Sequence, residues 1–160
     1  MPRRVYVKGK RTYAKGQQDV IKGNRFMNTI SLTSMRVEDV HESSPLDKVG
    51  EFFFRIDPEG LDVKTGTEIR VPQHGEIHIP LNKTFTPKQD FSLWLGFDKA
   101  DKGEKTKSIK ITVFEHDKLR DDKIIEAELP VVYGSGTKYE ILRGKGLKVK
   151  LKISSSRTRF

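Results

Sequence analysis

From residue 26 onward, hydrophobic and polar residues alternate along the chain with a period of two. In 147–153, for example, Leu, Val, Leu and Ile alternate with three lysines. Such alternation is typical of β-strands that have one face on a core and the other in water. Eight segments of this kind are predicted, separated by turns rich in glycine and proline. They cover residues 30–32, 52–56, 69–71, 77–81, 91–97, 109–113, 125–129 and 147–153.

No segment has the pattern of an amphipathic helix. A single sheet would leave its apolar side chains in water, so two sheets must pack face to face. The sequence therefore predicts one all-β domain over 26–160, a two-sheet antiparallel β-sandwich of about eight strands. Trp94 alternates with Leu93 and Leu95, so its side chain is predicted to point away from the core. There it would anchor an interface or lie beneath the N-terminal segment.

The net charge of +9 is concentrated at the two ends of the chain. Residues 1–25 contain eight Lys or Arg and one acid, residues 143–160 contain seven and no acid, and the segment between them is mildly acidic. This pattern predicts a basic N-terminal arm, 1–25, and anionic partners. The residues expected to bind such partners are Arg3, Arg4, Lys8, Lys10, Arg11, Lys148, Lys150 and Lys152.

Several classes of function are not indicated. The chain has no cysteine, which excludes disulfides, thiolate catalysis and zinc–thiolate sites. No nucleophile–base pair or phosphate-binding fingerprint stands out, so we expect neither an enzyme nor a small-molecule substrate. His74 and His78 lie where a turn and a strand are predicted, not a helix, so we expect two surface histidines and not a metal-binding pair. We expect no signal peptide and no transmembrane segment, and a location inside the cell or in a particle.

One stretch is more specific. A strand over 109–113 is followed by Glu115 and Asp117, a short loop, Asp122, and a second alternating strand that ends at Pro130. This order resembles the sixth strand, third loop and seventh strand of C2 domains, and 138–153 is similar to the end of that fold. The sandwich is therefore expected to be C2-like or jelly-roll-like.

The resemblance also implies a metal. Many C2 domains bind calcium through acidic residues of their first and third loops, because calcium needs six to eight oxygen ligands. Calcium is the one cofactor that the resemblance suggests. Basic residues among the acids of loop three would neutralise them, which favours a C2-like sandwich without metal. The implied calcium ligands are Asp39, Asp47, Glu115, Asp117 and Asp122.

Two functions follow. The first is a non-enzymatic assembly role: a structural component of a multi-subunit particle, for example a virion, whose basic arm contacts other protein subunits or nucleic acid. The alternative is a C2-type peripheral membrane domain that binds phospholipid, with or without calcium. Some C2 domains bind phosphoinositide through a lysine-rich strand, and Lys148, Lys150 and Lys152 resemble such a strand. The same lysines would also protect an edge strand from aggregation.

Overall fold

The computed structural model describes residues 25–38, 49–58, 69–100 and 105–158. All eight predicted segments lie in or overlap its strands, and β5 and β9 are additional. The strands are β1 (Arg25–Val37), β2 (Val49–Pro58), β3 (Ile69–Val71), β4 (Ile77–Pro80), β5 (Thr84–Phe85), β6 (Ser92–Lys99), β7 (Thr106–His116), β8 (Asp121–Val132), β9 (Gly136–Gly144) and β10 (Leu147–Arg157).

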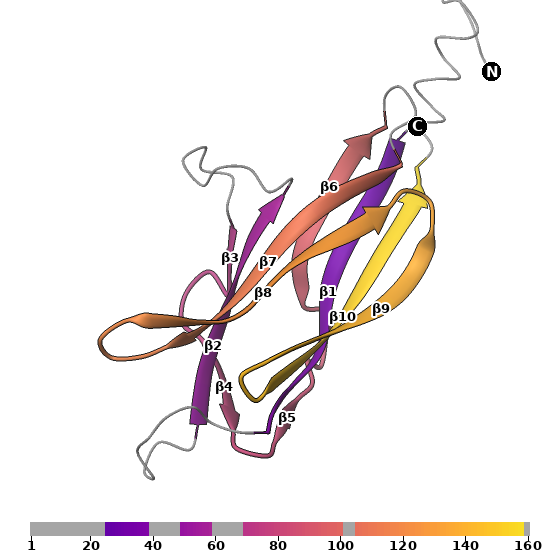
Figure 1. The fold of residues 1–160 in the computed structure, drawn as a ribbon. Coiled ribbons are helices and arrows are strands. Elements are labelled where there is room, and N and C mark those ends of the chain that lie inside the picture. Colours follow the sequence, from indigo (N-terminus) through magenta and orange to yellow (C-terminus); the bar gives the residue numbers. More distant parts are fainter. Residues whose placement is uncertain (1–24, 39–48, 59–68, 101–104, 159–160) are drawn as a thin grey trace, which may run out of the picture.

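The strands form two antiparallel sheets, which Figure 1 shows as two layers. The first, called here the β10 sheet, has the order β5-β1-β10-β9, and β6 also pairs with β1. The second, the β7 sheet, has the order β3-β2-β7-β8, and β4 also pairs with β2. The predicted antiparallel two-sheet sandwich is confirmed.

The core lies between the two sheets. Burial alternates along β10 as the sequence pattern predicts, and along β1 it alternates up to Leu32, where an irregularity in the pairing with β10 shifts the buried positions to Met35 and Val37. Each large apolar side chain removed from water stabilises the fold by about 1.5–3 kcal/mol, so these inward rows hold the sheets together. The inward side chains with no exposed surface include Ile30, Met35, Phe54, Ile56, Ile109, Ile111, Val149 and Leu151.

The prediction for Trp94 is wrong. In β6, Trp94 pairs with Ile30 of β1 but Ser92 pairs with Ser31, so Leu93 is an extra residue in a β-bulge. Because of the bulge, consecutive residues Leu93 and Trp94 both enter the core, with 2% and 6% of their surface exposed. Trp94 is therefore a core residue and not an interface anchor.

After this bulge the strand continues in the opposite phase. Leu95 and Phe97, which the pattern assigns to the core, are 54% and 65% exposed. A shift of one residue exchanges the two faces of a strand, which explains this reversal. The outer surface of the β10 sheet thereby gains two large apolar side chains.

A further bulge lies between β7 and β8. Val113 pairs with Ile125 and Phe114 with Lys123, so Ile124 is the additional residue, and both isoleucines are buried. At this point β8 approaches β9 of the other sheet. A Cβ atom added to Gly144 would lie 2.6 Å from the Ile124 carbonyl oxygen, so the approach needs a glycine.

The predicted N-terminal arm lies outside the described residues except for Arg25, where β1 begins. In the described part of the chain, no helix is long and apolar enough to cross a membrane. The predicted anion-binding residues that cannot be placed are Arg3, Arg4, Lys8, Lys10 and Arg11.

Candidate functional site

The most distinctive surface is the outer face of the β10 sheet. Along β10 the apolar residues are buried, and Lys148, Lys150 and Lys152 project to the opposite side. Residues two apart on a strand are about 6.7 Å apart, so the three ammonium groups form a continuous row. This arrangement follows directly from the two-residue period of the sequence.

Two arginines from neighbouring strands extend this row sideways. Lys148 pairs with Arg36 of β1 on one side and with Arg143 of β9 on the other, about 5 Å away along the sheet. We call Arg36, Arg143 and the three lysines the basic face. Sequence reasoning missed the two arginines as members of this group, because only the order of the strands brings them beside Lys148.

The partners of the basic face are mostly neutral. Arg36 donates a hydrogen bond from Nη1 to Thr84 Oγ1 at 3.1 Å, and Lys150 Nζ lies 5.2 Å from the centre of the Tyr139 ring. Arg143 Nη1 is 3.8 Å from Glu38 Oε1 in an exposed pair. No acid among the described residues forms an ion pair with any of the three lysines. The face therefore carries an uncompensated positive charge within the described structure.

Exposed apolar side chains surround these cations. Tyr139 and Ile141 of β9 pair with Lys152 and Lys150, and they are 55% and 48% exposed. Toward the other end of the same face, Met27 of β1 pairs with Phe97 of β6, next to Leu95. The surface thus combines cations with aromatic and aliphatic groups, a combination that also suits the interface of a membrane.

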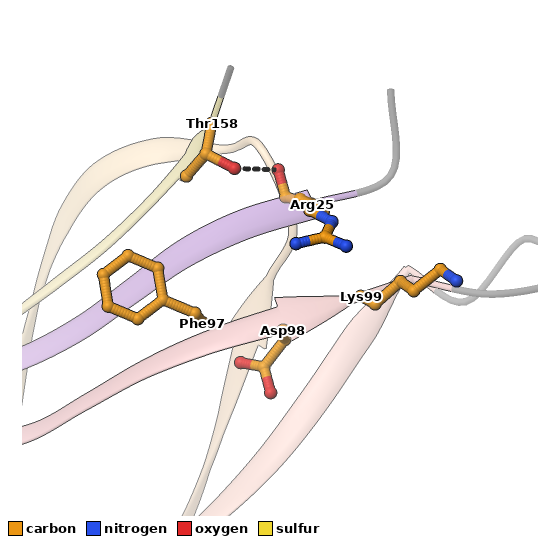
Figure 2. Close-up of a pocket in the computed structure, with 5 residues that line it drawn as sticks. All are labelled: Arg25, Phe97, Asp98, Lys99 and Thr158. Atoms are coloured by element: carbon orange, nitrogen blue, oxygen red, sulfur yellow. Dashed lines mark hydrogen bonds between the residues drawn. The ribbon is translucent and has the colours of Figure 1, made fainter. Parts of the chain in front are cut away.

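A small pocket lies at the Phe97 end of this surface (Figure 2). It is lined by Arg25, Phe97, Asp98, Lys99 and Thr158, and the Thr158 hydroxyl donates to the Arg25 carbonyl oxygen at 3.2 Å. The Asp98 carboxylate already binds Asn28 and Lys107. Apart from this occupied carboxylate, the charged groups of the pocket are those of Arg25 and Lys99.

The loop between β7 and β8 holds the described part of the predicted calcium set. Glu115 faces inward and is only 6% exposed, and Arg120 Nε lies 3.2 Å from Asp122 Oδ1. Within the described residues, the carboxylates of Glu115, Asp117 and Asp122 are not gathered into one group of ligand atoms. These three residues alone therefore do not form a calcium site. The other two predicted ligands, Asp39 and Asp47, lie outside the described residues.

His116, at the end of β7, also has an acidic partner. Its Nδ1 atom lies 2.8 Å from Asp121 Oδ1, and this hydrogen bond raises the pKa of His116 above its ordinary value. Asp121 and Asp122 are thus paired with basic neighbours, as the sequence predicts for loop three, whereas Asp117 is exposed.

Comparison with known proteins supports the fold assignment. The sequence matches no protein-family model and no curated protein. The structure is similar to human GIVD cytosolic phospholipase A2, with a TM-score of 0.55 and 9% identity over 84% of this chain and 17% of that chain. The same human enzyme in complex with methyl gamma-linolenyl fluorophosphonate and terbium chloride gives 0.53 and 9%, over 84% and 18%.

A structure described as a C2 domain gives a TM-score of 0.48 and 12% identity, over 83% of this chain and 98% of that chain. The chain spans less than a fifth of the length of the phospholipase chains that it matches. Identities this low show the fold alone. The predicted C2-like β-sandwich is confirmed by the two antiparallel sheets and by the match to the phospholipase.

Proposed function

We propose that this chain is a non-enzymatic, peripheral membrane-binding domain that docks on anionic lipid through the basic face. The observation that carries the proposal is the position of β10. This strand lies between β1 and β9 inside its sheet, with both edges hydrogen-bonded. Its lysines are therefore not explained by protection of an edge strand, which was the other interpretation of the sequence pattern.

Electrostatics favours an anionic partner for this surface. Like charges about 5–7 Å apart on adjacent positions repel one another, and an anionic surface relieves that repulsion. A basic residue near an anionic bilayer contributes about 1 kcal/mol, so the three lysines together contribute about 3 kcal/mol. Such an interaction is screened by salt, because the charges are exposed.

The apolar rim gives the proposal a second support. Phe97 and Leu95 project from the same sheet as the lysines, and more than half of each side chain is exposed. Aromatic and aliphatic groups beside basic residues stabilise binding at the boundary between headgroups and acyl chains. Lysines that only kept other chains from pairing with the sheet would not need exposed apolar side chains beside them.

The proposed docking does not depend on calcium. Glu115 is buried, Asp121 and Asp122 are paired with His116 and Arg120, and the basic face needs no metal to attract phosphate. The assembly role inferred from charge segregation depends mainly on residues 1–24, which lie outside the described structure, and stays a prediction.

Sedimentation with lipid vesicles tests the proposal. The full chain is expected to pellet with vesicles that contain phosphatidylserine and not with pure phosphatidylcholine vesicles, equally in calcium and in chelator. Higher salt is expected to weaken the binding. If the chain fails to pellet with anionic vesicles at low salt, the proposal is wrong.

A matched pair of variants locates the binding surface. The double variant Lys150→Gln/Lys152→Gln removes two charges from the basic face, and we expect vesicle partitioning to fall roughly 30-fold, the equivalent of about 2 kcal/mol. The control Lys110→Gln/Lys123→Gln removes the same charge from the outer face of the β7 sheet, where both lysines pair with Glu126. Equal losses in both variants would show that only net charge matters and would contradict a specific docking face.

A further inference from the structure

The outer face of the β7 sheet carries a second group of functional side chains, at the end that bears the β7–β8 loop. His78 of β4 pairs with Glu51 of β2, and His116 of β7 pairs with Asp121 of β8. Phe52 pairs with Glu115, so the same antiparallel register sets Glu51 beside His116. Four titratable residues from four strands therefore form one row across the sheet.

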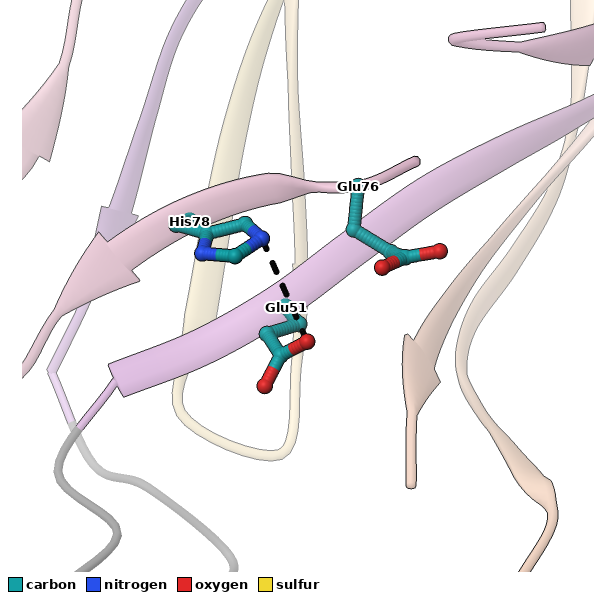
Figure 3. A group of neighbouring side chains, drawn as sticks. All are labelled: Glu51, Glu76 and His78. Carbon is teal, nitrogen blue, oxygen red and sulfur yellow. Dashed lines mark ion pairs between the residues drawn. The ribbon is translucent and has the colours of Figure 1, made fainter. Parts of the chain in front are cut away.

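Glu76, just before β4, joins this row from one side. The carboxylate oxygens of Glu51 and Glu76 and a ring nitrogen of His78 all lie within 4.8 Å of one another, and His78 Nε2 is 3.9 Å from Glu51 Oε1. Figure 3 shows the three side chains gathered over β2 and β4. A tetrahedral zinc ion with ligands at about 2.0–2.2 Å separates them by roughly 3.4 Å. Small side-chain rotations therefore bring the three groups to bonding distance.

Glu76 is held in place by Arg70. The guanidinium lies 3.0 Å from Glu76 Oε2, donates to the carbonyl oxygens of Pro72 and Gly75, and stacks 4.0 Å above the ring of Phe53. The Glu76 side chain is only 17% exposed. Carboxylates that bind metals are commonly oriented by hydrogen bonds of this kind. Because Arg70 engages Oε2, Oε1 remains for a cation.

His116 supplies an independent indication. Its Nδ1 atom is engaged by Asp121 at 2.8 Å, which leaves Nε2 as the ring nitrogen for another ligand. The strand register sets His116 beside Glu51, and its ring nitrogens lie outside the 4.8 Å group formed by Glu51, Glu76 and His78. A histidine whose second nitrogen contacts a carboxylate is the usual form of a metal-binding histidine.

We infer that Glu51, Glu76 and His78 bind a divalent transition-metal ion of the zinc class, with His116 as the fourth ligand. Mixed imidazole and carboxylate ligands suit zinc, whereas calcium requires six to eight oxygens. The ion would tie β4, β2 and β7 together on the face opposite to the basic face. This inference does not depend on the proposed lipid function.

Titration calorimetry of the full chain with zinc chloride, after treatment with a chelator, tests the site. We expect one zinc ion per chain, no competition by calcium, and a melting temperature that rises with zinc concentration. The double variant Glu51→Gln/His78→Ala is expected to lose at least about 100-fold in affinity, and His116→Ala about 10–100-fold. All these side chains are at least partly exposed, and circular dichroism of the metal-free variants shows whether they fold.

One control separates a built site from chance binding by a surface histidine. His74→Ala removes an imidazole from the turn before β4 that is not part of the group. This variant is expected to bind zinc as the unchanged chain does. Absence of zinc binding, or a loss in this control equal to that of the double variant, would overturn the inference.

Discussion

Replacing Asp98 with alanine should destabilise the fold, because this carboxylate joins three strands. Asp98 Oδ1 lies 2.5 Å from Lys107 Nζ of β7, and Oδ2 accepts a hydrogen bond from Asn28 Nδ2 of β1 at 2.6 Å. The side chains of Asp98 and Lys107 are only 14% and 13% exposed, and Asn28 has no exposed surface. The carboxylate thus connects the two sheets from within a largely dry environment.

The expected loss can be worked out from these contacts. Hydrogen bonds to a charged group contribute about 1.5–3 kcal/mol each, and removing one partner of a buried pair costs about 3–5 kcal/mol. Since the pair is slightly exposed, we expect Asp98→Ala to lower the free energy of unfolding by about 3 kcal/mol. In a double-mutant cycle with Lys107→Met, the coupling energy between the two side chains should be about 2 kcal/mol.

Urea denaturation followed by tryptophan fluorescence measures this effect. Trp94 is the single tryptophan, it is 6% exposed, and Lys107 Nζ lies 5.3 Å from its ring centre. Its emission should therefore report unfolding of the core. With a slope of about 2 kcal/mol per molar urea, the midpoint should fall by about 1.5 M. A shift of less than about 0.3 M, or no coupling in the cycle, would refute the reasoning.

Three further changes test other parts of the fold. Gly144→Ala should lower the melting temperature because its Cβ would lie 2.6 Å from the Ile124 carbonyl oxygen, and an unchanged temperature in thermal denaturation would contradict that contact. Met35→Ala, at a position with no exposed surface, should cost about 2–5 kcal/mol in urea denaturation; a cost below about 1 kcal/mol would argue against its burial. The hydrogen bond from Lys110 lowers the pKa of Glu126 below its ordinary value of 4.5, so this pair stabilises the fold above that pH and the contribution is lost as the pH falls through the lowered pKa. The melting temperatures of the unchanged chain and Glu126→Gln should therefore converge in acid, and a constant difference at every pH would contradict the pairing.

Much of the fold is predictable because the alternation is a direct consequence of strand geometry. The lysines of β10 and the apolar residues between them take opposite sides in the structure as they do in the pattern. The exceptions are three irregularities in the strand pairing. At Thr33, Leu93–Trp94 and Ile124–Ile125, one additional residue reverses the phase of the strand, and no local signal in the sequence marks the place.

The candidate sites are less predictable because they depend on which strands become neighbours. Arg36 and Arg143 are more than a hundred residues apart, yet both flank Lys148 because β10 pairs with β1 and β9. In the same way, the sequence predicts His78 as a surface histidine, which its exposure confirms, but only the strand pairing places Glu51, 27 positions earlier, across from it in the sheet. Spacing along the chain carries no information about such pairs.

The most direct test of the proposed function is to determine which face of the sandwich meets the bilayer. The chain contains no cysteine, so single cysteines can carry a fluorescent label at Ser31, which pairs with Lys152 on the basic face, or at Glu128, on the outer surface of β8. With anionic vesicles that contain brominated lipids, the label at position 31 should be quenched and the label at position 128 should not. Stronger quenching at position 128, or equal quenching at both positions, would contradict docking through the basic face.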